Sequence, residues 1–432
     1  MPQLCTLTAG ELSQLHERLR ARYERFRAIG FSLDMSRGKP SAEQLDLSND
    51  LLTCVGPDSY RATDGTDCRN YGGTEGLPEA RALFAGLLGA RPEQTMVGGN
   101  SSLTMIYYCI AWAMSHGVPD GDGPWRRLPV VRFLCPSPGY DRHFAILEHL
   151  GIEMVPVGIG PNGPDMEAVE RLSRDDAAVR GIVCVPKYSN PTGIVYSDET
   201  VDRLAAMKTA TRDFRILWDN AYAVHDLTDS PPVLKNILEA CAAEGHPDRA
   251  YVYGSTSKVT FAGAGVAAMA ASVRNISRLA KLVDVQTIGP DKLNQLRHVR
   301  FLRNMDGIRA HMRRHAATLR PKFDAVQRAF EAELGGKGVA EWSKPQGGYF
   351  VSLDVTPGQA RTVVAMAAEA GVKLTPAGAT FPYGRDPQDR NIRIAPTWPP
   401  LDEVRRAMEI VATCVELAAV CKLLEAKGPT AG

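Results

Sequence analysis

The feature that most constrains this chain is an alternation of short apolar runs with amphipathic stretches between residues 128 and 272. The apolar runs are rich in β-branched or aromatic residues and are bounded by Gly, Pro or Asp. They read LPVVRFLC, IEMVPVGI, RGIVCVP, FRILWD, AYVYGS and GVAAMAAS. The amphipathic stretch at 197–211 opens with Ser197, a residue type that caps helix N-termini. Strands that alternate with helices form a largely parallel sheet covered on both faces, so the pattern predicts an α/β fold.

The rest of the chain predicts a second, smaller unit. Residues 273 to about 330 are helical and basic in pattern, with few strand signals. After them come a strand pattern at 347–355, a helix at 362–371, a short strand at 391–396 and a closing helix from about Asp402. This mixture is typical of a small α+β domain. The predicted division is 1–50 for an N-terminal segment packing with the small domain, 51–325 for the large domain and 326–432 for the small C-terminal domain.

Composition excludes several classes of partner. Lys plus Arg number 50 and Asp plus Glu 49, a net charge of +1, so nothing favours nucleic acid or an anionic membrane as a partner. Nine cysteines are scattered without tight spacing, which indicates reduced thiols. The N-terminal residues form a charged amphipathic pattern without a signal peptide, and no apolar stretch reaches the roughly 18 residues of a membrane span. We therefore expect a cytoplasmic protein.

The sharpest chemical signal is a lysine on a small-residue loop. The segment Tyr253–Lys258 follows a predicted strand and reads YGSTSK. Burial depresses the pKa of an amine, and the neutral amine is the form that condenses with an aldehyde to a Schiff base. An exposed loop lysine is the alternative interpretation of this segment alone.

Three other segments favour the chemical interpretation. Asn190 lies in NPTG after one predicted strand, and Asp219 closes another in FRILWD. Together with Lys258 they fall at the carboxyl ends of successive strands, the edge where open α/β sheets bind ligands. Arg393 lies inside a short apolar strand, where a permanent charge needs an anionic partner.

The order N-P-x-G, D-x-x-Y, S-x-S-K and a late R-I resembles class I aminotransferases of fold type I, which use pyridoxal 5'-phosphate (PLP). The resemblance covers nearly the whole chain from about Leu33. More narrowly, SLDMSRGKP, NYGGTEGLPEAR, GGNSSL, CPSPGYDRHF and GSTSKVTFAGAG resemble a bacterial subgroup of aspartate aminotransferases called MocR-type. The resemblance implies the PLP-transferase fold type I, with a mostly parallel sheet between helices in the large domain and a small α+β domain.

The resemblance also implies roles around the cofactor ring. Lys258 would hold PLP and move the substrate proton, and Asp219 would face the pyridine nitrogen and keep the ring an electron sink. Asn190 and Tyr222 would hydrogen-bond the phenolic oxygen, and Tyr140 would stack on the ring. A core aromatic is the alternative for Tyr140.

Further positions match the family around this centre. His143 would support Asp219, with a plain helix-face histidine as the alternative. Tyr71 would reach the phosphate of the neighbouring subunit, so a homodimer with shared active sites is implied. The start of a predicted helix and two hydroxyls would bind the cofactor phosphate. These phosphate residues are Asn100, Ser101, Ser102, Ser255 and Ser257.

One position departs from the family. Many class I enzymes place a phosphate-binding arginine eight residues after the lysine, where this chain has Val266. Lys292 is a candidate replacement.

Substrate recognition follows the same resemblance. Arg393 would bind the substrate α-carboxylate, with Gly38 and Asn190 beside it. Arg37 is a candidate for a second carboxylate. Arg297 or Arg303, reaching across a dimer interface, is a further candidate for that second carboxylate.

We therefore expect a PLP enzyme of amino-acid metabolism that exchanges an amino group between an α-amino acid, aspartate or glutamate, and a 2-oxo acid. An aromatic or kynurenine-type transaminase or a β-lyase would use the same cofactor chemistry. A non-catalytic effector-sensing domain of a regulator is a third possibility, but only about 30 residues precede Ser32, too few for a winged-helix module.

One histidine pair resembles a metal motif. His311 and His315 have the spacing of zinc ligands but lack the H-E-x-x-H glutamate and are flanked by arginines. We expect them on a solvated helix face.

Overall fold

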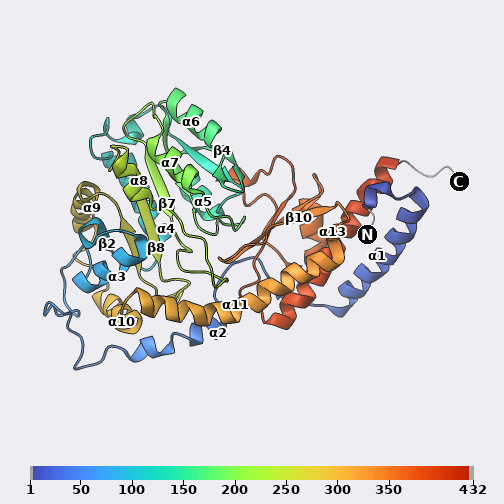
Figure 1. Cartoon of the computed structure of the whole chain (residues 1–432), viewed down its shortest axis with the longest axis horizontal. Coiled ribbons are helices and arrows are strands. Elements are labelled where there is room, and N and C mark those ends of the chain that lie inside the picture. Colours follow the sequence, from blue (N-terminus) through green and yellow to red (C-terminus); the bar gives the residue numbers. More distant parts are fainter. Residues whose placement is uncertain (1–2, 428–432) are drawn as a thin grey trace.

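A computed structural model describes residues 3–427. Its larger body is built on an eight-stranded sheet with the order β2-β9-β8-β7-β6-β3-β4-β5 (Figure 1). The strands from β8 to β4 run parallel, while β9 is antiparallel to both of its neighbours and β5 is antiparallel to β4. This confirms the predicted α/β fold. The strands are β2 (Thr95–Val97), β3 (Arg132–Ser137), β4 (Glu153–Gly160), β5 (Gly163–Pro164), β6 (Val179–Cys184), β7 (Arg215–Asp219), β8 (Ala250–Ser255) and β9 (Ala267–Ala270).

Both faces of the sheet are buried, which explains the continuous apolar runs. Side chains alternate along β7, with Ile216 and Trp218 in one apolar cluster and Leu217 in another. Different helices cover the two faces. The first cluster contains residues of α3 (Pro78–Leu88), α6 (Met166–Asp175), α7 (Asp198–Ala206), α8 (Ile237–Ala243) and α10 (Lys292–Leu302). The second contains residues of α4 (Ser102–His116), α5 (Asp141–His149) and α9 (Val273–Gln286).

The smaller body, at the right of Figure 1, has its own core. A three-stranded antiparallel sheet has the order β10-β11-β13, and β1 pairs parallel with β12. The N-terminal helix α1 packs along the closing helix α13, and Arg22 of α1 pairs with Glu333 at 2.7 Å. The elements are α1 (Ala9–Ile29), β1 (Leu33–Asp34), β10 (Ala340–Trp342), β11 (Val351–Val355), α12 (Ala360–Glu369), β12 (Val372–Lys373), β13 (Asn391–Ile394) and α13 (Leu401–Lys427).

The long helix α11 (Met305–Leu334) joins the two bodies, with the short α2 (Ala42–Asp46) beside it (Figure 1). The expectation that His311 and His315 lie on a solvated face is wrong, since they are only 6% and 1% exposed. The helix is covered on more than one side where it passes between the bodies. His315 Nδ1 lies 3.1 Å from the Gln44 amide nitrogen, and His311 Nε2 lies 2.8 Å from the Val259 carbonyl oxygen.

No helix among residues 3–427 has the length and apolar character needed to span a bilayer.

Candidate active site

A cavity of about 230 Å³ lies at the carboxyl ends of β6, β7 and β8. These strands are neighbours in the sheet, so the segments that follow them meet at one edge. Asn190 follows β6, Asp219 ends β7 and Lys258 follows β8, as predicted. Most of the residues proposed from the sequence line this cavity. They are Ser101, Ser102, Tyr140, Asn190, Asp219, Tyr222, Ser255, Ser257 and Lys258.

The amine of Lys258 is held among aromatic rings. Its Nζ lies 5.2 Å from the centroid of the Tyr222 ring and 5.9 Å from that of Tyr349. Burial lowers the pKa of Lys258, and the Asp219 carboxylate opposes that shift in part. A lowered pKa raises the fraction of neutral amine, the nucleophilic form.

Only one of the two carboxylate oxygens of Asp219 has a hydrogen-bond partner among residues 3–427. Its Oδ2 lies 2.9 Å from Nε2 of His143, and both side chains are only 2% exposed. Among residues 3–427 its other oxygen, Oδ1, is buried without a hydrogen-bond partner. Buried polar atoms are nearly always paired, so the site lacks one donor. Because His143 is buried against this carboxylate, a plain helix-face histidine is excluded.

Two tyrosines form walls of the cavity. Tyr140 precedes α5, and its ring centroid lies 4.9 Å from that of His143. Tyr222 is buried, and burial raises the pKa of its hydroxyl well above the usual value. The Tyr222 hydroxyl therefore stays protonated and can donate a hydrogen bond.

The opposite end of the cavity is suited to an anion. Helix α4 starts at Ser102, and no side chain caps its N-terminus. Its first backbone N–H groups have no partner within the helix, and the helix dipole adds positive potential there. The Ser257 hydroxyl donates to the Asn100 carbonyl at 3.0 Å, and the Ser255 hydroxyl donates to Ser257 at 3.1 Å. These groups form a small polar cradle.

Val266, at the position where many class I enzymes have a phosphate-binding arginine, is buried. Val266 is 1% exposed, and its N–H donates to the Thr256 hydroxyl at 2.9 Å. The candidate replacement, Lys292, does not line the cavity and instead donates to the Gly72 carbonyl at 2.6 Å. Arg297 and Arg303 do not line the cavity either.

Arg393 is buried at the small-domain side, with 5% of its surface exposed. Its Nη1 lies 2.7 Å from Oδ1 of Asp141 and 3.3 Å from Oδ1 of Asn190. Its Nε donates to the Thr375 hydroxyl at 3.3 Å. Arg393 does not itself line the cavity, but it contacts Asn190, which does.

Gly38 supports the arginine indirectly. A Cβ at Gly38 would lie 2.4 Å from the Phe350 ring, so no larger residue fits there unless Phe350 moves. The Arg393 guanidinium carbon lies 5.0 Å from the centroid of the same ring. Arg37 is exposed and does not line the cavity.

Sequence reasoning missed several neighbours of this site. Asp141 and Thr375 hold Arg393, while His225 Nε2 and the Tyr349 hydroxyl lie 3.3 and 3.4 Å from the Lys258 carbonyl oxygen. Asp141 directly follows Tyr140, and His225 lies three residues after Tyr222, so charged or polar neighbours of motif residues were the available signal.

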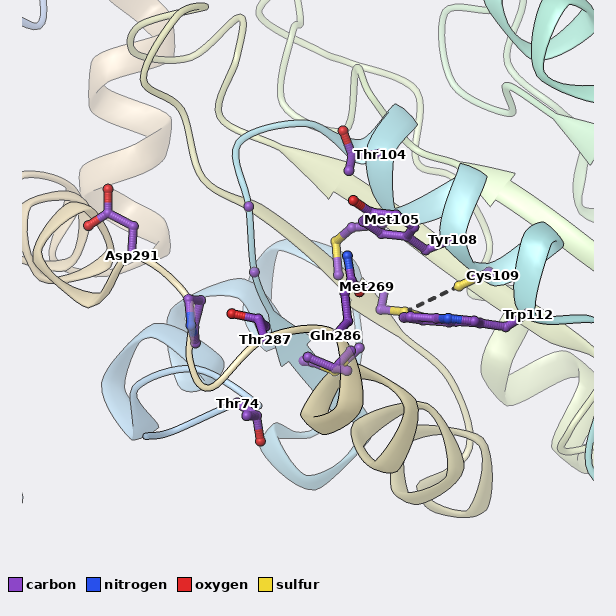
Figure 2. A pocket seen from close by; sticks show the side chains of 15 residues that line it. Thr74, Thr104, Met105, Tyr108, Cys109, Trp112, Met269, Gln286, Thr287 and Asp291 are labelled. Carbon is purple, nitrogen blue, oxygen red and sulfur yellow. Dashed lines mark hydrogen bonds between the residues drawn. The ribbon is translucent and has the colours of Figure 1, made fainter. Parts of the chain in front are cut away.

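A second pocket, of about 280 Å³, lies between α4 and the end of α9 (Figure 2). Apolar side chains such as Met105, Trp112 and Met269 dominate it, and the Cys109 thiol contacts the Met269 sulfur at 3.8 Å. Because it lacks a cluster of reactive groups, the chemistry is assigned to the cavity at Lys258.

Comparison with known proteins identifies the family of this chain. The family model described as aspartate amino-transferase matches residues 7–427. A Mycolicibacterium smegmatis protein named as an aminotransferase is 51% identical over 421 residues, covering 97% of this chain and 98% of the relative. The aspartate aminotransferase of Corynebacterium glutamicum is 45% identical over 411 residues, 95% of each chain.

Solved structures agree as well. The crystal structure of an aspartate transaminase from Corynebacterium glutamicum matches with a TM-score of 0.95 and 44% identity, covering 98% of this chain and 99% of that one. An α-aminoadipate aminotransferase from Thermus thermophilus, 21% identical with a TM-score of 0.72, shares the fold. The expected PLP-transferase fold type I is thereby confirmed. The chain belongs to the aspartate aminotransferase family, and it is a transaminase.

Proposed function

We propose that this chain uses PLP to exchange an amino group between aspartate or glutamate and a 2-oxo acid. The observation that carries the proposal is the buried, unpaired Oδ1 of Asp219 in the same cavity as the amine of Lys258. The substrate class is supported by the Corynebacterium glutamicum relative, which is named an aspartate aminotransferase.

The residues present fit PLP. A protonated pyridine nitrogen is the kind of donor that Asp219 Oδ1 lacks, and the start of α4 with its serine cradle suits a phosphate. The aldehyde would meet the Lys258 amine, and Tyr140 would cover the ring. When bound, PLP supplies an electron sink that stabilises negative charge at the substrate Cα.

The side chains of this chain then divide the work. The neutral Lys258 amine would accept the proton from the substrate Cα and hold it for return. Tyr222 and Asn190 would donate hydrogen bonds to the ring oxygen of the cofactor. His143 holds Asp219 in place. Arg393, with Gly38 and Asn190 beside it, binds the α-carboxylate, and Arg37 is our candidate for the distal one.

A donor screen tests this function. Purified protein with PLP is incubated with 2-oxoglutarate and single amino acids, and new glutamate is measured. We expect aspartate to be the best donor and Lys258→Ala to abolish turnover. Borohydride reduction followed by peptide mass spectrometry should find the cofactor on Lys258. Pyruvate and ammonia released without any 2-oxo acid would instead identify a β-lyase.

We further propose a homodimer with shared active sites. The Tyr71 side chain is 77% exposed, Ile288 63% and Val285 88%, which is unusual for apolar residues of this size. The segment around Tyr71 and the segment 285–292 lie together, since the Gly72 N–H donates to the Ile288 carbonyl at 3.0 Å and the Lys292 amine donates to the Gly72 carbonyl. This surface suits a second copy whose phosphate end accepts Tyr71.

The apolar pocket of Figure 2 involves the same two segments as the surface proposed for the second copy. Thr74, Thr287 and Asp291, from the same two segments, line it together with Gly98 and Gly99, which precede the phosphate cradle. Hybrid dimers test the sharing: Tyr71→Ala and Lys258→Ala chains are mixed, refolded and assayed. Recovery of activity is expected, because one of the two sites then has both native side chains. A monomer in sedimentation analysis would refute the dimer.

Finer assignments rest on the same motifs. We propose that the chain belongs to the MocR-type subgroup, on the segments that resemble it, and that it is cytoplasmic, since all nine cysteines are free thiols. We also propose the division into 1–50, 51–325 and 326–432, with the second boundary inside the continuous helix α11.

A further inference from the structure

The anionic partner of Arg393 in this structure is Asp141. The Asp141 Oδ1 lies 2.7 Å from Nη1, and among residues 3–427 this carboxylate has no other side-chain partner. The two side chains differ in burial, with Arg393 5% and Asp141 31% exposed. Asp141 is the first residue of α5, immediately after the cavity wall Tyr140. A partly exposed carboxylate therefore contacts a buried cation.

The Arg393 guanidinium cannot bind a second carboxylate bidentately unless one of its present partners leaves. Bidentate pairing needs two adjacent N–H groups on one side of the fork. Nη1 already donates to Asp141 and Asn190, and Nε donates to Thr375. Only Nη2 has no partner among the described residues. An incoming carboxylate therefore needs one of these three partners to leave, and Asp141 is the one that carries a negative charge and repels it.

We propose that Asp141 is an exchangeable carboxylate that occupies Arg393 between turnovers and yields to the α-carboxylate of the substrate. The inference rests on the proposed role of Arg393. After leaving, Asp141 remains at the N-terminus of α5, where the helix dipole and water stabilise its charge. Asp141 thus holds the guanidinium in place and competes with the substrate for it.

This competition acts on binding alone. Amino acid and 2-oxo acid both bring an α-carboxylate, so both must displace Asp141. An interaction that opposes ground state and transition state equally changes KM and leaves kcat. Asp141 is therefore a positioning and affinity-setting residue rather than a catalytic one.

Asp141→Asn tests the proposal, because it keeps the shape and an oxygen acceptor but removes the charge. We expect KM for aspartate and for 2-oxoglutarate to fall about fivefold, the equivalent of about 1 kcal/mol for one partly exposed ion pair, with kcat within about twofold. Calorimetric titration of the holoenzyme with succinate, a carboxylate that does not react, should show the same gain in affinity.

Matched variants separate the outcomes. Glu148→Gln removes an exposed charge from the same helix and should leave KM and succinate affinity unchanged. Weaker succinate binding in a folded Asp141→Asn protein, checked by its melting temperature, would overturn the proposal and leave Asp141 as a support only. Arg393→Lys should weaken succinate binding strongly. If it does not, Arg393 is not the carboxylate site, and the proposed role fails together with this one.

Discussion

Two charged side chains of the site, Asp219 at the proposed cofactor end and Arg393 at the proposed substrate end, are prepared for their ligands in opposite ways. At the cofactor end, Asp219 keeps one buried oxygen without a partner. At the substrate end, Arg393 has oxygen partners on both Nη1 and Nε, one of them the Asp141 carboxylate. An unpaired buried acceptor costs about 1–3 kcal/mol, which a permanently bound donor recovers. This difference is what our proposal requires, a resident ligand at Asp219 and a ligand that leaves in every cycle at Arg393.

The strongest test of this contrast removes the charge at the cofactor end. Asp219→Asn keeps the volume but replaces the carboxylate that would keep the pyridine nitrogen protonated. We expect kcat with aspartate to fall about a thousandfold or more, a size typical of losing one preorganised electrostatic contact. Cofactor content, measured by absorbance after alkaline release, should fall much less than kcat. A parental rate would remove Asp219 from the mechanism.

At the substrate end, Arg393→Lys should reduce kcat/KM by about a hundredfold, because the planar fork is lost while the charge remains. Steady-state kinetics with aspartate and 2-oxoglutarate measures this loss. Arg405→Lys, at an exposed ion pair on α13, is the control and should change nothing. If Arg393→Lys retained its full kcat/KM, the carboxylate would have to bind elsewhere.

A smaller effect is expected at His143, which contacts Asp219 rather than the proposed cofactor. His143→Leu leaves the buried Asp219 Oδ2 without its 2.9 Å partner. Hydrogen bonds to charged groups are worth about 1.5–3 kcal/mol, so kcat should fall roughly ten- to a hundredfold. His143→Asn, which can still donate, should recover part of the rate. His149→Leu, exposed on the same helix, should behave as the parent. Equal losses in the Asn and Leu variants would contradict a hydrogen-bonding role.

The sequence could predict the cofactor end because its residues follow strands. Strand periodicity identifies β6, β7 and β8, and parallel strands bring Asn190, Asp219 and Lys258 to one edge regardless of loop detail. The substrate end lacks such a rule. Asp141 and Arg393 are 252 residues apart and belong to different bodies, so only tertiary packing brings them together.

The burial of His311 escaped prediction for a related reason. Its helix has an ordinary amphipathic pattern, and nothing in that pattern shows that Ser48 and the Val259 backbone lie against His311. The surroundings of Lys292 could not be predicted either, since its amine donates to the backbone carbonyl of Gly72, 220 residues away in the sequence.

The smallest expected effect concerns the protein layer behind Lys258. His225 contacts the Lys258 carbonyl, and burial, with the nearby Lys258 charge, lowers the pKa of His225 to about 3. Below pH 6.5 the unfolded chain binds a proton that the folded chain does not take up until about pH 3, so the free energy of unfolding falls as pH falls. At pH 6 this loss is about 0.8 kcal/mol relative to pH 8 for one such histidine.

Urea unfolding of the wild type and of His225→Gln between pH 8 and pH 5 measures that loss, with stability compared as a slope against pH rather than as an absolute value. The variant should have the shallower slope, since it no longer takes up this proton on unfolding. His149→Gln, exposed on α5, should keep the parental slope. An unchanged slope in His225→Gln would mean that His225 takes up its proton over the same pH range in the folded and the unfolded protein, so burial would not lower its pKa.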